Sequence, residues 1–199
     1  MTTIKKIVVI GPESTGKSSL CKKLAEHYNT LWVPEYAREY LEKNGADYTY
    51  ENLLTIAKGQ IDLEESITYQ LTGLSDKNLQ NPSASLPGTP DLIFIDTDMN
   101  VMKVWCEFVF NNCHNWILNR IAERKYDLYL LCNVDLPWVA DILREYPDKN
   151  TREKLYRFYK DLLVNQTVPW SNISGGYTER FEKAVAFIEA SLTKKIALK

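Results

Sequence analysis

The sequence contains few of the residues that bind metal ions or form disulfides. Two histidines, His27 and His114, and four cysteines occur among its 199 residues, and no two cysteines form a C-x-x-C pair. This scarcity argues against a zinc site. Scattered thiols, behind an N-terminus too short in apolar length for a secretion signal, are typical of a reducing compartment. We therefore expect a cytoplasmic protein.

The sequence also lacks an excess of one charge and long apolar runs. Its 24 basic and 26 acidic side chains give a formal net charge of −2, so no bulk electrostatic attraction draws it to nucleic acid or to an anionic membrane. No uncharged apolar run approaches the roughly 18 residues that a membrane-spanning helix needs. We expect neither a nucleic-acid nor a membrane partner, and the composition leaves a homo-oligomer open.

What the sequence does contain is the composition of a globular domain. Apolar residues make up 45% and charged residues 25% of it, which is ordinary for a folded protein. The length fits one domain over residues 1–199, and no repeat of solenoid period occurs. The function must therefore be sought in local motifs.

Short apolar runs alternate with longer amphipathic stretches. The apolar runs predict strands at 4–10, 30–33, 91–95, 127–132 and 167–173. Periodic stretches predict helices at 17–28, 37–43, 50–71, 152–164 and 178–192, and two more between 99 and 124 that are separated near Asn111. Thr178 is expected to cap the last helix. The proline-rich stretch 75–90 and the polar stretch 135–150 are predicted to be irregular.

This alternation predicts the fold class. Strands separated by helices imply right-handed crossovers and an α/β fold, with a five-stranded, mostly parallel sheet and helices on both faces. In such sheets ligands bind at the carboxyl ends of the strands. We therefore expect the site among the residues that follow positions 10, 33, 95, 132 and 173.

The first of these positions opens a phosphate-binding motif. Residues 11–18 read Gly-Pro-Glu-Ser-Thr-Gly-Lys-Ser and match G-x-x-x-x-G-K-[ST] between a predicted strand and a predicted helix. Glycines let the backbone curl so that its N–H groups point inward, and the helix N-terminus adds positive potential. Lys17 would reach the β- and γ-phosphates of ATP, and the Ser18 hydroxyl would bind Mg²⁺. The predicted nucleotide-binding residues are Gly11, Glu13, Ser14, Thr15, Gly16, Lys17, Ser18 and Ser19.

Carboxylates follow the predicted strand at 91–95. Four apolar residues precede Asp96, as in a Walker-B strand, whose carboxylate holds Mg²⁺ directly or through water. Asp98, two residues further on, is a candidate substrate-binding residue. It could equally be the N-cap of a helix that begins at Met99, so both interpretations of Asp98 stay open.

A third polar group follows the predicted strand at 30–33. Glu35, Tyr36 and Arg38 fall on the same sheet edge as the phosphate motif. A carboxylate there could accept a proton from a substrate hydroxyl, and an arginine could neutralise charge or bind a ribose. The alternative is an ordinary helix start, where the helix dipole favours an acidic residue.

The polar segment at 135–152 is a candidate lid. Arg144 and Arg152, on a flap over the nucleotide, could neutralise the transferring phosphoryl group and exclude water. The alternative is a solvated loop whose arginines pair with its own acids. Trp138 could stack on a planar base, whereas Trp105 stands in an apolar stretch and is expected in the core.

Together these motifs resemble the ribosylnicotinamide kinase domain of NadR-type proteins, within the nucleoside- and nucleotide-kinase group of P-loop folds. The similarity spans nearly the whole chain. It departs from the family pattern at 139–143, which keeps one acid and no glycine before the arginine. The stretches that carry it are residues 11–18, Pro34-Glu-Tyr-Ala-Arg-Glu-Tyr40, Asp96-Thr-Asp98 with Lys103-Val-Trp105, and Asp135-Leu-Pro-Trp138 with Arg144.

The resemblance implies ATP-dependent phosphorylation of the ribosyl 5′-hydroxyl of nicotinamide riboside, which yields the mononucleotide in NAD salvage. It also implies Glu35 or Asp96 near that hydroxyl, and Arg144 and Arg152 on the lid. ATP and Mg²⁺ are the expected cofactors, with Ser18 and Asp96 as metal ligands. The predicted catalytic residues are Lys17, Glu35, Asp96, Arg144 and Arg152. The predicted substrate-binding residues are Glu35, Tyr36, Arg38, Asp98 and Trp138.

Two other functions stay open. A regulatory P-loop ATPase would hydrolyse ATP to drive a partner interaction without a small acceptor, although the guanine-reading Asn-Lys-x-Asp motif is absent from the sequence. A nucleotide-binding module without catalysis would leave Glu35 and Asp96 without a role. Dependence of turnover on a nucleoside distinguishes the kinase from both.

Overall fold

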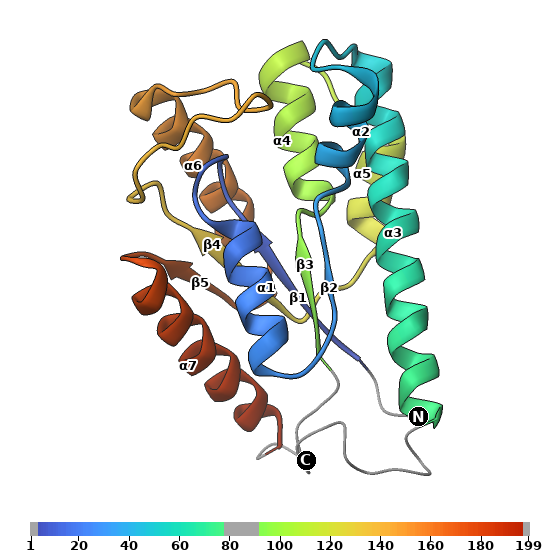
Figure 1. The fold of residues 1–199 in the computed structure, drawn as a ribbon, viewed down its shortest axis with the longest axis vertical. Coiled ribbons are helices and arrows are strands. Elements are labelled where there is room, and N and C mark those ends of the chain that lie inside the picture. Colours follow the sequence, from blue (N-terminus) through green and yellow to red (C-terminus); the bar gives the residue numbers. More distant parts are fainter. Residues whose placement is uncertain (1–3, 78–91, 197–199) are drawn as a thin grey trace.

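The computed structural model describes residues 4–77 and 92–196. In this part of the chain five strands form one sheet between two layers of helices (Figure 1). The strands lie in the order β2-β3-β1-β4-β5, and every pairing is parallel. The predicted α/β fold with a five-stranded parallel sheet is therefore confirmed. The strands are β1 (Lys5–Ile10), β2 (Trp32–Val33), β3 (Leu92–Asp96), β4 (Leu128–Cys132) and β5 (Trp170–Ile173).

The helices divide between the two faces of the sheet. Helices α1 and α7 pack on one face, and α3, α4 and α6 pack on the other (Figure 1). No helix in the described ranges combines the length and the apolar character needed to cross a membrane. The helices are α1 (Lys17–His27), α2 (Tyr36–Asn44), α3 (Tyr50–Lys77), α4 (Met99–Phe110), α5 (Asn115–Glu123), α6 (Lys149–Val164) and α7 (Tyr177–Ile196).

The central strands are buried on both faces. Ile7 and Val9 of β1 pack toward α1 and α7, while Val8 and Ile10 belong to the core under α4 and α6. Successive side chains of a strand point to opposite faces, so a strand covered on both sides is an unbroken apolar run. A third apolar cluster joins α2, α3, α4 and α5 beyond the edge strand β2.

Two helix starts differ from those predicted. Helix α6 begins at Lys149, because the carboxylate of Asp148 accepts the N–H of Thr151 at 2.7 Å and caps the helix there. Helix α7 begins at Tyr177, so the prediction that Thr178 caps it is wrong.

One helix end also differs. Helix α3 continues to Lys77, beyond the predicted end at position 71, because no proline occurs before position 82. The first three residues of the predicted loop at 75–90 are therefore helical, and the rest of that loop lies outside the described residues. The predicted break between α4 and α5 is confirmed at Asn111, whose φ of 51° is left-handed.

The sheet brings the candidate residues to one edge. Strand β1 lies between β3 and β4, with Val9 opposite Asp96 and Ile10 opposite Leu131. The phosphate motif, Asp96 and the residues that follow Cys132 therefore meet at the carboxyl ends of three adjacent strands. The segment from 133 to 148, which joins β4 to α6, is called the roof segment below.

Candidate active site

The phosphate loop, residues 11–16, joins β1 to α1, and its shape depends on two glycines. Gly11 has a φ of 142°, and a Cβ atom there would lie 2.7 Å from the carbonyl oxygen of Cys132. Gly16 has a φ of 78°. Ser14 is also left-handed, with a φ of 55°, which costs a non-glycine residue about 1 kcal/mol or more. The surroundings of the loop therefore hold it in a conformation that the free chain would seldom adopt.

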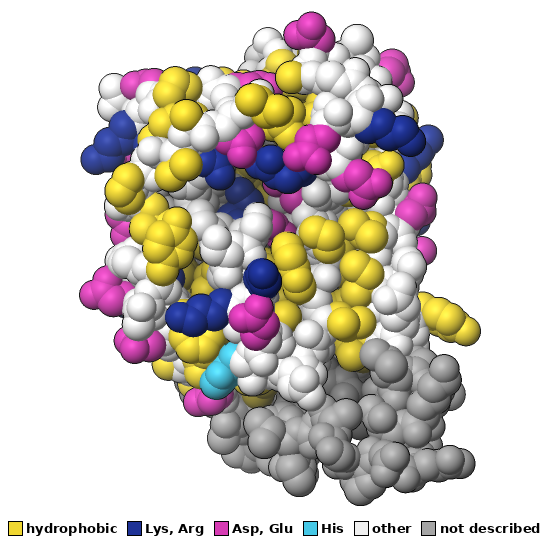
Figure 2. Space-filling model, in the orientation of Figure 1, with side chains coloured by type: hydrophobic (Ala, Val, Ile, Leu, Met, Phe, Trp, Pro, Cys, Tyr) yellow, Lys and Arg dark blue, Asp and Glu magenta, His cyan; other side chains and the backbone are white. Residues whose placement is uncertain are grey.

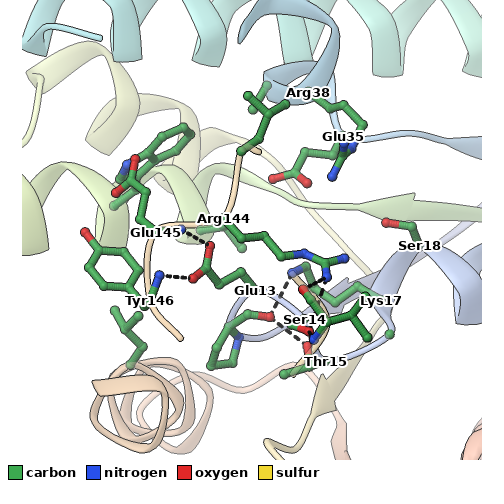
Figure 3. Close-up of a pocket in the computed structure, with 18 of the residues that line it drawn as sticks. Glu13, Ser14, Thr15, Lys17, Ser18, Glu35, Arg38, Arg144, Glu145 and Tyr146 are labelled. Carbon is green, nitrogen blue, oxygen red and sulfur yellow. Dashed lines mark hydrogen bonds between the residues drawn. The ribbon is translucent and has the colours of Figure 1, made fainter. Parts of the chain in front are cut away.

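The loop is arranged to receive an anion. The Thr15 hydroxyl donates to the carbonyl oxygen of Pro12 at 2.7 Å, and Lys17 Nζ donates to the same oxygen at 3.0 Å (Figure 3). The first turn of α1 contains no acidic residue, so nothing in that turn neutralises the positive potential at the helix N-terminus. Free N–H groups at a positive helix end are what a phosphate group requires.

A cavity of about 320 Å³ lies beside this loop, a size that suits a small organic ligand. Figure 2 has the orientation of Figure 1. It shows basic and acidic side chains gathered between α2 and the roof segment. The polar side of the cavity is formed by residues 12–19, Glu35, Arg38, Arg144 and Glu145. The apolar side is formed by Leu41, Val101, Val104, Trp105, Phe108, Leu143, Leu155 and Tyr159.

Asp96 lies at the end of β3, beside the phosphate loop. Its side chain is fully buried, and neither carboxylate oxygen has a hydrogen-bond partner in the described chain. Burial raises the pKa of Asp96 to about 6, although the positive charge of Lys17 acts in the opposite direction. The nearby Ser18 side chain also lowers this pKa, but its hydroxyl is outside hydrogen-bond geometry. A buried carboxylate without donors is costly, which indicates that a ligand completes this group.

Asp98 is buried as deeply as Asp96 but is fully used by the fold. Its carboxylate caps α4 by accepting the N–H groups of Asn100 at 3.0 Å and Val101 at 3.3 Å. It also accepts the hydroxyl of Tyr129 at 2.8 Å. Asp98 is absent from the cavity lining, so the structure favours the capping interpretation over substrate binding.

Glu35 and Arg38 line the cavity across from the phosphate loop (Figure 3). Glu35 directly precedes α2, yet its side chain makes no capping hydrogen bond. Its carboxylate is therefore not held by a capping hydrogen bond, although the helix dipole would favour an acid at this position as well. Arg38 Nη2 pairs with Asp141 of the roof segment at 3.0 Å, which joins α2 to that segment.

Tyr36 is placed beside the cavity rather than in it. Its N–H donates to Gln60 Oε1 at 2.7 Å, and its ring packs so closely on α3 that a Cβ at Gly59 would lie 2.0 Å from Tyr36 Cε1. The ring is absent from the cavity lining. The structure therefore shows Tyr36 fixing α2 against α3.

The roof segment is tied to the phosphate loop through two side chains. The carboxylate of Glu13 accepts the N–H of Glu145 at 3.1 Å and also that of Tyr146 (Figure 3). Ser14 Oγ accepts the N–H of Val139 at 3.1 Å and Arg144 Nη1 at 3.3 Å. Burial raises the pKa of Glu13. The segment is therefore attached to the phosphate loop and, through Arg38, to α2.

The two arginines predicted on the lid have different surroundings. Arg144 lines the cavity and contacts Ser14 rather than the acids of its own segment. Arg152 is buried in α6, with Nε and Nη1 unpartnered in the described chain, and its guanidinium lies 5.2 Å from the ring centre of Trp138. Arg144 approaches the same ring at 5.9 Å. Trp138 and Arg152 are absent from the cavity lining, so of these three residues only Arg144 reaches the cavity.

Sequence reasoning missed several residues that shape the site. Trp105, expected in the core, lines the cavity and donates its indole N–H to the Tyr48 hydroxyl at 2.7 Å. Gln60, almost fully buried, donates to the Pro34 carbonyl at 3.2 Å. Arg180, also almost fully buried, donates to the Thr15 carbonyl at 2.9 Å. Gln60 and Arg180 each occupy a position in the apolar stripe of their helix. A polar residue at such a position is the feature of the sequence that could have identified them.

The fold and the phosphate loop define the class of the protein. A parallel sheet with this loop between β1 and α1, and an acidic residue at the end of the adjacent β3, is the structure of a P-loop nucleotide-binding protein. The chain belongs to the family described as "AAA domain", whose sequence model matches residues 6–180. The match includes the phosphate loop, Asp96 and the whole roof segment.

Two curated relatives are both described as "Trifunctional NAD biosynthesis/regulator protein NadR". The protein from Escherichia coli K12 is 26% identical over 191 residues, which cover 93% of this chain and 42% of the relative. The protein from Salmonella typhimurium LT2 is 25% identical over 192 residues, which cover 94% and 42%. The chain therefore spans less than half the length of these relatives.

Two crystal structures share the fold. One is of NadR protein in complex with NR, with a TM-score of 0.70, and the other is of NadR protein in complex with NAD and AMP-PNP, with a TM-score of 0.63. Each is 21% identical to this chain and covers 94% of it, and the match spans 49% of the crystallised chain. The resemblance to NadR-type proteins that the motifs indicated is confirmed.

Proposed function

We propose that this protein is an ATP-dependent kinase that phosphorylates a hydroxyl of a small nucleoside. The acceptor we propose is the ribosyl 5′-hydroxyl of nicotinamide riboside, which would give the mononucleotide. One observation carries the proposal: a single cavity joins the phosphate loop to an aromatic chamber, with the carboxylate of Glu35 on its border. Residues 1–199 would then form one kinase domain, with the roof segment as its lid.

The polar side of the cavity suits the triphosphate of ATP. The loop N–H groups, the positive end of α1, Lys17 and Arg144 all bring positive potential to this side. Phosphoryl transfer depends mainly on positioning and on neutralising the charge of the transferred group. A donor bound here would therefore have its γ-phosphate beside the groups that such a transfer needs.

The residues at the strand end also fit Mg²⁺. Asp96 has two oxygens without donors, and the Ser18 hydroxyl lies near it at the start of α1. Hard oxygen ligands of this kind are those that Mg²⁺ prefers, completed by water and phosphate oxygens. Mg²⁺ held by Ser18 and Asp96 would supply charge neutralisation at the β- and γ-phosphates.

The opposite side of the cavity suits a nucleoside. Glu35 would accept the proton of the acceptor hydroxyl, whose oxygen would then form a bond to the γ-phosphorus while ADP leaves. Arg38, beside it, would hold the ribose, and the aromatic side chains Trp105 and Phe108 would pack on a planar base. We favour Glu35 over Asp96 as the base because Glu35 lines the cavity and Asp96 does not.

The relatives support the same assignment. NadR has been crystallised with NR, nicotinamide riboside, and with NAD and AMP-PNP. The polar side of the cavity suits an ATP analogue, and its aromatic side suits a pyridine nucleoside. The four cysteines are free thiols, which supports the cytoplasmic setting that we propose.

An acceptor screen tests the proposal. The protein is incubated with Mg²⁺, ATP and a panel of nucleosides that includes nicotinamide riboside, and phosphorylated products are identified by mass. We expect the mononucleotide from wild type and an almost complete loss in Glu35→Gln. ATP hydrolysis that is indifferent to every nucleoside would instead establish a regulatory ATPase.

A further inference from the structure

We propose that Arg180 of α7 is a positioning residue for the phosphate loop, which it holds in the conformation that receives nucleotide. The inference rests on the proposed function, in which this loop binds the phosphates of ATP. Arg180 is absent from the cavity lining. It would act through the backbone carbonyl of Thr15, without touching either substrate.

Arg180 is the largest fully buried side chain in the described part of the chain, with 2% of its surface exposed. Its guanidinium donates to carbonyl oxygens of three separate segments. Nη1 donates to Thr15 in the phosphate loop at 2.9 Å, Nη2 to Asn133 after β4 at 2.9 Å, and Nε to Gly175 after β5 at 2.7 Å. One planar group therefore fixes three carboxyl-edge segments relative to each other.

Asp135 completes this arrangement. Its Oδ1 pairs with Arg180 Nη2, and its Oδ2 accepts the N–H of Gly175 at 2.6 Å. The carboxylate thus balances the buried charge and fixes the start of the roof segment. The phosphate loop, the roof segment and the turn before α7 are held through the same ion pair.

The Thr15 contact has a consequence for anion binding. A loop that directs its N–H groups at a phosphate must direct its carbonyl groups elsewhere, and buried carbonyls need donors. The carbonyl of Pro12 has the Thr15 hydroxyl and Lys17 as donors, and the carbonyl of Thr15 has Arg180. Ser14, left-handed at a φ of 55°, directly precedes this anchored residue. Arg180 therefore opposes relaxation of the loop out of its strained conformation.

A second buried cluster shows what a purely structural arginine does in the same fold. Arg124 pairs with Glu64 at 2.7 Å and Glu65 at 2.9 Å. It joins α5 to α3 near the amino ends of the strands and makes no contact with the phosphate loop. Arg124→Met is therefore the matched control, because it removes a networked arginine far from the nucleotide.

The experiment compares wild type with Arg180→Lys, Arg180→Met, Asp135→Asn and Arg124→Met. Calorimetry measures the dissociation constant of the magnesium–ATP complex, and steady-state kinetics measures KM for each substrate. We expect Arg180→Met to weaken nucleotide binding by about tenfold or more. Arg180→Lys, which keeps the charge but cannot contact three carbonyls, should be intermediate. KM for the nucleoside should stay within about twofold.

Amide exchange in the nucleotide-free protein provides a readout that does not depend on activity. Exchange of residues 14–17 should be faster in Arg180→Lys and Asp135→Asn, and unchanged in Arg124→Met. If the two Arg180 variants and Asp135→Asn weaken nucleotide binding no more than the control Arg124→Met does, the role of Arg180 is refuted. If wild type binds no nucleotide, the proposed function fails, and unchanged exchange of residues 14–17 would then also refute the role of Arg180.

Discussion

Two buried carboxylates at opposite ends of the sheet differ in whether the fold supplies their partners. At the amino end, the buried carboxylate of Glu64 pairs with Lys6 at 2.7 Å and with Arg124 at 2.7 Å, and accepts the Tyr126 hydroxyl at 3.0 Å. At the carboxyl end, both oxygens of the buried Asp96 lack a partner. The Glu64 carboxylate therefore has three partners within the fold, and the Asp96 carboxylate has none in the described residues.

The same contrast recurs within one strand end. Asp96 and Asp98 are two residues apart and equally buried, yet Asp98 accepts hydrogen bonds from two backbone N–H groups and from Tyr129. Burial alone therefore does not distinguish these two carboxylates. The absence of hydrogen-bond donors does, and the following predictions vary that difference.

Lys17→Ala should have the largest effect. In the proposed function the ammonium group would neutralise phosphate charge, so its loss should lower turnover by about 1000-fold or more. Its one described hydrogen bond is to the Pro12 carbonyl within its own loop, so the midpoint of thermal unfolding should stay close to that of wild type. Retained turnover would contradict the role of Lys17.

Asp96→Asn should raise stability while it lowers activity. In the ligand-free protein Asp96 binds its proton up to about pH 6, against about 3.9 for an unfolded carboxyl. Its contribution to the free energy of unfolding is therefore fully present below about pH 4 and is lost as the pH rises through 6. The total decline in the free energy of unfolding is about 3 kcal/mol. Denaturant unfolding across pH 4–8 should show this decline in wild type and lose it in Asp96→Asn.

Asp98→Asn is the control for that variant. It alters a carboxylate that caps α4 and whose oxygens all accept hydrogen bonds, so the free energy of unfolding at neutral pH should fall by about 1 kcal/mol. Opposite signs for the two substitutions support the contrast between the two carboxylates. If Asp96→Asn were the more destabilising substitution, the contrast would be wrong.

Glu64→Gln should affect stability and spare activity. Lys6 and Arg124 would lose the carboxylate that they share, at a cost of about 2 kcal/mol in the free energy of unfolding. Turnover should stay within about twofold, because this cluster lies at the opposite end of the sheet from the cavity. Glu65→Gln is the matched control: Glu65 is 63% exposed, so its loss should cost about 0.5 kcal/mol or less.

Asp141→Asn should have the smallest effect. The Arg38–Asp141 pair joins α2 to the roof segment, but the Arg38 side chain is 45% exposed, and exposed pairs contribute little. KM for the nucleoside should rise by at most about fivefold, with less change at high salt. Glu107→Gln is the control, because the pair of Glu107 with Lys103 lies within one helix. A similar change of KM in this variant would show that the effect is not specific to the roof segment.

The parts of this structure that could be predicted from the sequence are those determined by residues adjacent in the chain. The phosphate loop is a local motif, and β1, β3 and β4 each contain an unbroken apolar run of four or five residues, so both could be recognised without tertiary information. Asp96 could be recognised because it ends such a run. The start of α6 was predicted too late because Asn150 and Thr151 beside Asp148 can also cap a helix, and α7 begins one residue before the predicted cap Thr178.

The parts that sequence did not predict depend on contacts between distant residues. The bond from the Tyr146 N–H to Glu13 joins residues 133 positions apart, and that from Arg180 to the Thr15 carbonyl joins residues 165 positions apart. No local pattern encodes such partners. Trp105 was expected in the core because an apolar stretch reads alike whether it faces a core or a cavity.

The most direct test is calorimetric titration of the protein with the magnesium complex of AMP-PNP. The proposed function predicts saturable binding that is strongly weakened in Lys17→Ala and unchanged in Glu64→Gln, because only the carboxyl end of the sheet would hold the nucleotide. Absence of binding by folded wild-type protein, or equal loss in both variants, would contradict it.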